Sequence, residues 1–203
     1  MDAAAELVAE RGVEGATLAD IGGRAGVSRG LATHHFGSKN ALVARLARRA
    51  QQGIASAMLA KLDRQSRHVE DLSGLDIVHL TVDSYLELFE DPTPDQRALL
   101  VVWGSTFPSH SSLEGMVEAE RRSYVGLSEV IADGQSDGSI RPDIEPSAAA
   151  VLVLGMIRGT AALLLTDSGL TDMTSVRKTC SAWIDSALAR DPRPQAGPGL
   201  ALR

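Results

Sequence analysis

The stretch A-G-V-S-R-G-L-A-T-H-H-F-G-S-K-N-A, residues 25–41, decides the fold of the N-terminal part of this chain. Gly26 can adopt a positive φ and end a preceding helix, because it has no Cβ. Ser28 is a favoured N-cap for the helix that follows. Gly37 breaks that helix and Ser38 caps another. The pattern predicts two helices joined by a tight turn and followed at once by a further helix, which is typical of a helix-turn-helix.

The short helix that Ser28 opens has a polar side and an apolar anchor. Arg29 and Thr33 lie four residues apart, so they share one face. Phe36 is the large apolar residue behind them, and Val27 is expected to plug the gap between the two helices of the motif. A short exposed helix of this kind can enter a DNA groove. Arg29 is expected to be the best base reader, because its guanidinium can donate two hydrogen bonds to one base.

The residues before this stretch predict two more helices. Thr17 to Asp20 has the form of a capping box with Asp in place of the usual Glu. It opens a helix whose apolar residues Leu18, Ile21 and Ala25 are spaced three and four apart. Another amphipathic helix precedes it and is expected to end near Gly12. Three short helices, of which the third is polar and basic, form a common DNA-reading unit.

Positive charge is concentrated at the same end of the chain. Residues 21–62 contain seven Lys and Arg and no Asp or Glu, although the whole chain has a net charge of −6. Residues 1–50 have a small net positive charge, and the remainder is strongly negative. A localised basic surface is what binding to phosphates requires. The alternative is a solvated basic face on an ordinary helical protein, and the turn pattern favours DNA binding over it.

The motifs T-x-x-D-I, A-G-V-S-R-G and H-H-F-x-S-K together resemble the N-terminal domain of the tetracycline-repressor (TetR) family of bacterial regulators. The resemblance covers about residues 2–50. Residues 133–150 also resemble the loop before the penultimate helix in many members, including those with a choline-repressor (BetI) type of C-terminal domain. The resemblance implies an all-α fold of about nine helices, with a DNA-binding domain over residues 1–50 and a ligand-binding and dimerisation domain over residues 51–190.

The resemblance also implies which side chains meet DNA. Lys39, Thr17 and the start of the fourth helix are expected to hold phosphates, while the exposed face of the third helix enters the major groove. Two positions depart from the family, because Thr33 stands where Tyr is frequent and Leu31 where a small polar residue is common. The complete set expected at the DNA is Thr17, Arg24, Ser28, Arg29, Gly30, Leu31, Thr33, His34, His35 and Lys39.

Composition agrees with a helical protein of the reducing cytoplasm. Of the 203 residues 44% are apolar but only 3% are aromatic, which favours helices over sheets. Cys180 is the single cysteine, and we find no secretory signal and no uninterrupted apolar run long enough to span a membrane. We expect no metal and no cofactor. His34 and His35 point to different sides of a helix, and the calcium-like loop from Asp133 lacks its final Glu.

Capping residues and prolines divide the rest of the chain into helices. The expected helices cover residues 38–61, 73–89, 93–107, 111–137, 146–166 and 172–190. From residue 191 the chain is rich in Pro and Gly, so residues 191–203 are predicted to be a disordered tail.

The last two helices, about residues 146–166 and 172–190, are the expected homodimer interface. The first is apolar nearly all round, so both of its faces should be covered, and Gly155 and Gly159 would let another helix approach closely. The second has an apolar stripe that could face either its own subunit or a partner. The stripe consists of Val176, Cys180, Trp183, Ile184 and Ala187. The family resemblance favours a two-fold, four-helix interface.

If the middle helices resemble those of the family, they enclose a pocket for a small-molecule effector. The candidate lining residues are His79, Asp83, Tyr85, Trp103, Phe107, Tyr124, Met156 and Arg158. Trp103 and Phe107 could equally be helix core. Arg158 could face an anionic ligand, pair with an acid such as Asp83 or Glu118, or reach solvent.

These observations predict a ligand-responsive transcriptional regulator, most simply a repressor. It would bind a palindromic DNA operator as a dimer and be released when an unidentified effector shifts the fourth helix. Two rivals stay open at this stage. One is a small helical enzyme, although no base and nucleophile pair is recognisable in the sequence, so we expect no enzyme activity. The other is a module that binds nucleic acid or an acidic protein without sequence preference.

Overall fold

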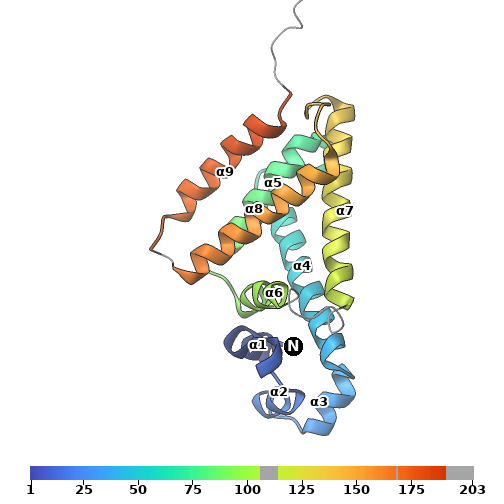
Figure 1. Ribbon diagram of the computed structural model, residues 1–203, viewed down its shortest axis with the longest axis vertical. Coiled ribbons are helices and arrows are strands. Elements are labelled where there is room, and N and C mark those ends of the chain that lie inside the picture. Colours follow the sequence, from blue (N-terminus) through green and yellow to red (C-terminus); the bar gives the residue numbers. More distant parts are fainter. Residues whose placement is uncertain (106–113, 168, 191–203) are drawn as a thin grey trace, which may run out of the picture.

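The computed structural model describes residues 1–105, 114–167 and 169–190 (Figure 1). Within these ranges helices are joined by turns and loops, and one isolated antiparallel β-bridge pairs Ile140 with Ala189. The first four helices are α1 (Asp2–Gly15), α2 (Leu18–Arg24), α3 (Arg29–Phe36) and the long α4 (Lys39–Arg64). A 3-10 turn, η1 (Val69–Asp71), leads to α5 (Gly74–Leu88), α6 (Pro94–Gly104), α7 (Glu114–Asp137), α8 (Pro146–Thr166) and α9 (Met173–Leu188). The predicted all-α fold of about nine helices is confirmed over the described residues.

The helix starts follow from local capping. The Oγ atoms of Ser28 and Ser38 accept hydrogen bonds from the backbone N–H groups of Leu31 and Ala41, each at 3.1 Å. The starts of α5 and α6 have full capping boxes, at Ser73 and Thr93. Gly26 and Gly37 have φ of 69° and 71°, as the turn pattern predicts. Each of these bonds joins residues three apart, which explains why the sequence predicts the boundaries well.

The turn between α2 and α3 closes differently from our expectation. Val27 was expected to plug the gap, but it is 37% exposed, and Ala25 is exposed as well. The helices are instead brought together at Gly22, where an added Cβ would lie 3.1 Å from the Val27 carbonyl oxygen and 3.3 Å from the Ala32 Cβ. Close contact through a residue without a side chain thus brings α2 and α3 together, and Val27 borders an apolar hollow of about 270 Å³ beside them.

The buried residues form two cores. One joins α1 to the first half of α4 and to α6, whose Ala98, Leu99 and Val102 are buried with the N-terminal helices. The other lies among α5, α7, α8 and α9. Arg49 of α4 adds a polar link to the first core, because its guanidinium bonds both Asp95 of α6 and Asp2 of α1, each at 2.5 Å. The helix α6 therefore packs with the DNA-reading end of the chain.

The helices α8 and α9 diverge from each other (Figure 1). Apolar side chains on both helices are exposed. By length and composition alone α8 could cross a membrane. Of its apolar 18-residue segment, 28% is buried inside the chain. Within a single chain one face of α8 is uncovered, since Leu152 is 73% exposed, so the covering of both faces stays a prediction about the dimer. The stripe on α9 divides, because Cys180 and Ile184 face the core whereas Trp183 is 63% exposed.

Candidate DNA-binding surface and effector sites

The helix α3 presents its polar residues outward on a buried apolar base. Ala32 and Phe36 are buried in the turn and the first core, which fixes the rotation of the helix. The exposed residues of α3 are Arg29, Gly30, Leu31, Thr33, His34 and His35. Exposure of a short helix along one whole side is the geometry that entry into a groove requires.

A hollow of about 470 Å³ lies between the start of α2, α3 and the start of α4. It brings together four of the residues expected at the DNA, namely Thr17, Arg29, Thr33 and Lys39. Two hydroxyl groups and two cations on one concave surface suit a backbone phosphate. Lys39 now bonds the Glu14 carboxylate at 3.0 Å, so a phosphate would compete with Glu14 for this ammonium group.

Two of the expected residues have other roles in the free protein. Arg24 forms a two-bond ion pair with Glu10, at 2.7 and 2.8 Å, which ties α2 to α1. The Ser28 hydroxyl caps α3. The sequence analysis did not single out Arg45, whose guanidinium lies 3.5 Å from the His35 ring and over the Phe36 ring. The acid-free stretch from residue 21 to 62 was the signal that could have identified it.

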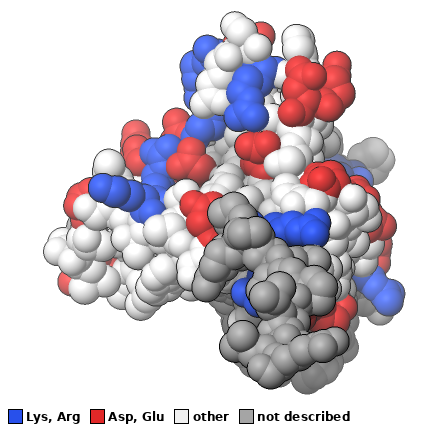
Figure 2. All heavy atoms as spheres, turned by 90° about the horizontal axis from the view of Figure 1, so that it is seen from above, with Lys and Arg blue, Asp and Glu red and all other residues white. Residues whose placement is uncertain are grey.

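The opposite end of the molecule has a different charge pattern. Seen from that end, positive and negative side chains are interspersed over the surface (Figure 2). A mixed surface gives no net attraction for a polyanion, so the charge pattern does not favour DNA binding at this end.

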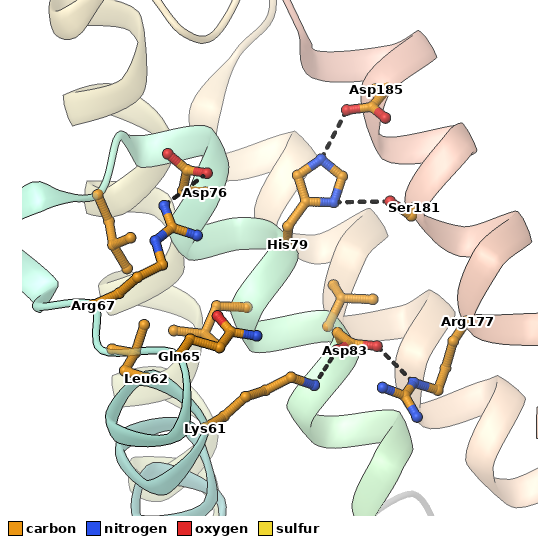
Figure 3. Close-up of a pocket in the computed structure, with 13 residues that line it drawn as sticks. Lys61, Leu62, Gln65, Arg67, Asp76, His79, Asp83, Arg177, Ser181 and Asp185 are labelled. Atoms are coloured by element: carbon orange, nitrogen blue, oxygen red, sulfur yellow. Dashed lines mark hydrogen bonds and ion pairs between the residues drawn. The ribbon is translucent and has the colours of Figure 1, made fainter. Parts of the chain in front are cut away.

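The residues expected to line one effector pocket lie in separate places. His79 and Asp83 of α5 line a polar cavity of about 310 Å³ between α4, α5 and α9 (Figure 3). Met156 lines an apolar groove between α8 and α9, and Tyr124 is half-buried on α7. Phe107 lies outside the described residues.

Charged groups in the polar cavity neutralise one another. Asp83 accepts hydrogen bonds from Lys61 of α4 and from Arg177 of α9, so one carboxylate links three helices (Figure 3). The Nε2 atom of His79 lies 2.8 Å from the Asp185 carboxylate, and its Nδ1 atom lies 3.3 Å from the Ser181 hydroxyl. Burial alone would raise the pKa of Asp83, but Arg177 and Lys61 outweigh it and hold the pKa below its ordinary value.

We expect Asp83→Asn to lower the free energy of unfolding at neutral pH by about 1 kcal/mol, the size of a partly solvated ion pair. Because the folded-state pKa is depressed, this stability is present above the unfolded value of about 3.9 and is lost as pH falls through the folded value. Urea denaturation from pH 7 to 3 should therefore show that the variant and the wild type differ in free energy of unfolding, and that this difference shrinks only at the acid end of the range. Glu70→Gln, at an exposed carboxylate, is the control. A difference independent of pH would contradict the assignment.

Three further candidates, Tyr85 of α5, Trp103 of α6 and Arg158 of α8, lie together with Glu120 of α7, and we call these four residues the interior cluster. Arg158 pairs with Glu120, so the expected partners Asp83 and Glu118 are wrong. Glu118 instead pairs with Arg122, one turn along the same helix. The Arg158 guanidinium also lies over the Trp103 ring, 5.9 Å from its centroid. Sequence reasoning missed Glu120, because its partner is 38 residues away on another helix.

Comparison with known proteins agrees with this geometry. Residues 1–46 match the family model described as "Bacterial regulatory proteins, tetR family". The transcriptional repressor KstR2 of Mycolicibacterium smegmatis is 28% identical over 163 residues, which cover 77% of this chain and 71% of the repressor.

Two solved structures share the fold. The transcriptional regulator FadR from Bacillus subtilis, in complex with stearoyl-CoA, has a TM-score of 0.70 at 19% identity and covers 90% of this chain and 94% of its own. AibR, in complex with isovaleryl coenzyme A and operator DNA, has a TM-score of 0.63 at 17% identity. The match covers 92% of this chain and 94% of the AibR chain.

The fold and the exposed α3 define a helix-turn-helix transcriptional regulator. Residues 1–46 are similar to the N-terminal domain of the TetR family, and the relatives that the chain matches are transcriptional repressors and regulators.

Proposed function

We propose that this chain acts as a homodimer that represses transcription by binding an inverted-repeat operator and that a small-molecule effector releases it. The observation that carries the proposal is α3, which exposes its polar side while Ala32 and Phe36 anchor it in the protein. In the hollow beside it, Thr17 and Lys39 supply phosphate contacts, and Arg29 and Thr33 border that hollow on the side of α3. Arg24, Ser28, Gly30, Leu31, His34 and His35 complete the proposed DNA surface.

The dimer proposed here forms through α8 and α9. Two apolar grooves, of about 330 and 400 Å³, lie along these helices and share Trp183. Exposed Leu152 and Leu163 add to an apolar surface larger than isolated exposed residues would make. A two-fold dimer would present two copies of α3, and half-sites about 34–36 Å apart suit such a pair.

The effector acts in the C-terminal part of the chain and changes the position of α4. Acyl-CoA complexes of two regulators with this fold support a small-molecule effector in general terms. For release, the effector must bind the state with low DNA affinity more tightly than the other state. Arg49 provides one mechanical link, since it joins α4 to both α1 and α6.

We propose that the regulator works in the cytoplasm, without enzyme activity, metal or cofactor; the described residues contain no cluster of metal-binding side chains. The boundaries at residues 50 and 190, and a choline-repressor type of C-terminal domain with residues 133–150 in its loop, stay predictions.

The experiment that tests the function is selection of bound sequences from a random duplex pool at near-physiological salt. We expect enrichment of an inverted repeat, and sedimentation of the protein with that repeat should give two chains for each duplex. Salt-sensitive binding without any enrichment would contradict the proposal and favour a module that binds nucleic acid nonspecifically.

A further inference from the structure

The interior cluster contains a largely buried ion pair, Arg158 with Glu120, next to the buried hydroxyl group of Tyr85. The side chains of Arg158 and Glu120 are 13% and 24% exposed. The Tyr85 hydroxyl, on a residue only 4% exposed, donates to no acceptor among the described residues, although Arg158 lies close enough to hydrogen-bond its oxygen and Glu120 close enough to affect its pKa. A buried polar group without a partner is unfavourable, and a bound molecule that supplies one removes that cost.

The part of α7 that contains Glu120 is hydrogen-bonded to α4, the helix that follows α3 in the chain. The Gln51 side-chain amide of α4 donates to the Ala119 carbonyl oxygen at 3.0 Å and to the Ser123 hydroxyl at 3.1 Å. Residues 119–123 of α7 are thus held on one side by Arg158, through Glu120, and on the other by α4. A change at Arg158 therefore has a direct mechanical route to α4.

The polar cavity between α4, α5 and α9 is less suited to receive an acid. Two of its lining cations, Lys61 and Arg177, are each held by more than one carboxylate. The third, Arg67, is solvent-exposed and pairs with Asp76, so an incoming anion would have to displace a carboxylate or water at each of them. In the interior cluster Arg158 has one carboxylate partner among the described ion pairs, and the Tyr85 hydroxyl is available to an acceptor.

We propose that the effector carries a carboxylate that replaces Glu120 at Arg158 and accepts a hydrogen bond from Tyr85, and that Gln51 transmits the release of α7 to α4. The inference rests on the proposed function and specifies its effector class. The body of the effector would meet apolar side chains, since Val82, Leu127 and Ile157 belong to the core that contains Tyr85. The displaced Glu120 would be more readily protonated, because burial raises its pKa and Arg158 no longer opposes that effect.

The first test uses calorimetry without DNA. The probes are straight-chain carboxylates from hexanoate to palmitate and primary alcohols of the same lengths. We expect at least one carboxylate to bind about tenfold or more tightly than its matched alcohol, because a charge-assisted hydrogen bond is stronger than a neutral one. If no carboxylate binds, or if the alcohols bind equally, the inference is overturned.

Neutral replacement of the pair tests the site. Glu120→Gln together with Arg158→Met leaves no single buried charge, so this double variant should fold even where Arg158→Met alone does not. We expect it to bind carboxylate and alcohol equally. The matched control is Glu118→Gln with Arg122→Met, an exposed pair on the same helix, which should keep the preference of the wild type. Retained preference in the interior variant would overturn the proposed site.

Replacing Gln51 by Leu tests the route to α4. The variant should bind the carboxylate as the wild type does, but the ratio of operator affinities without and with carboxylate should fall toward one. An unchanged ratio would overturn the role of Gln51. Failure of the wild type to select any operator would instead contradict the proposed function, because the calorimetric test requires no DNA.

Discussion

Arg29→Ala is expected to weaken operator binding by about 1–3 kcal/mol, which is roughly a 5- to 150-fold loss, and to relax the preference at one base pair in each half-site. Arg29 is exposed at the first turn of α3, where the N-terminal residues of a recognition helix meet base edges. Its planar guanidinium can donate two hydrogen bonds to one guanine, and alanine leaves that guanine edge without a partner.

The measurement is the affinity of each variant for the selected operator and for a random duplex, over a range of salt concentrations. Lys39→Ala is the matched contrast, because Lys39 lies in the same hollow but is expected to meet a phosphate. That variant should lose affinity for both duplexes alike. The slope of log binding constant against log salt concentration should fall in magnitude by about one. Equal losses on operator and random duplex for Arg29→Ala would remove it as a base reader.

Gly74→Ala is expected to lower the free energy of unfolding by about 1–3 kcal/mol or more, as overpacking in a closed contact does. An added Cβ at Gly74 would lie 2.4 Å from the Gly134 Cα and 2.7 Å from the Val130 carbonyl oxygen. Both obstacles are backbone atoms of α7, which cannot rotate away as a flexible side chain would. The start of α5 and the end of α7 would have to separate, and the bond from the Gly74 N–H to Asp137, now 2.8 Å, would lengthen.

Urea denaturation at neutral pH measures this effect. Gly126→Ala is the matched control, because Gly126 lies within α7 and an added Cβ there meets nothing within 4 Å. The control should be unchanged or more stable by up to about 1 kcal/mol, since alanine is the better helix former. Equal stability of Gly74→Ala and the wild type would show that α5 and α7 can adjust without cost.

The local features of this protein could be read from its sequence. Caps at Ser28, Ser38, Ser73 and Thr93 lie where the patterns predict them, because each depends on groups three residues apart. The exposure of the polar side of α3 also follows from its own sequence, since a helix buries its apolar stripe. Val27 is the exception, because the close approach at Gly22 depends on how two helices meet.

The effector candidates show where sequence reasoning fails. Eight residues were assigned to one pocket by their chemical type. Six of the seven that the structure describes separate into the polar cavity, the interior cluster and the groove by α8, and Tyr124 packs against the second core. A residue type does not determine which face of a buried helix it lies on when the helix is apolar nearly all round, as α8 is. The partner of Arg158 was misassigned for this reason.

The sequence by itself determined the helical class, the helix starts and the DNA-reading end, because caps, turn glycines and charge distribution act over short distances along the chain. Only the tertiary structure decided that α6 packs with the first helices, that Glu120 pairs with Arg158, and that Asp83 links Lys61 to Arg177. The last of these pairings joins residues 94 apart in the sequence. Such contacts depend on the packing of whole helices against one another, and no short stretch of the chain contains both partners.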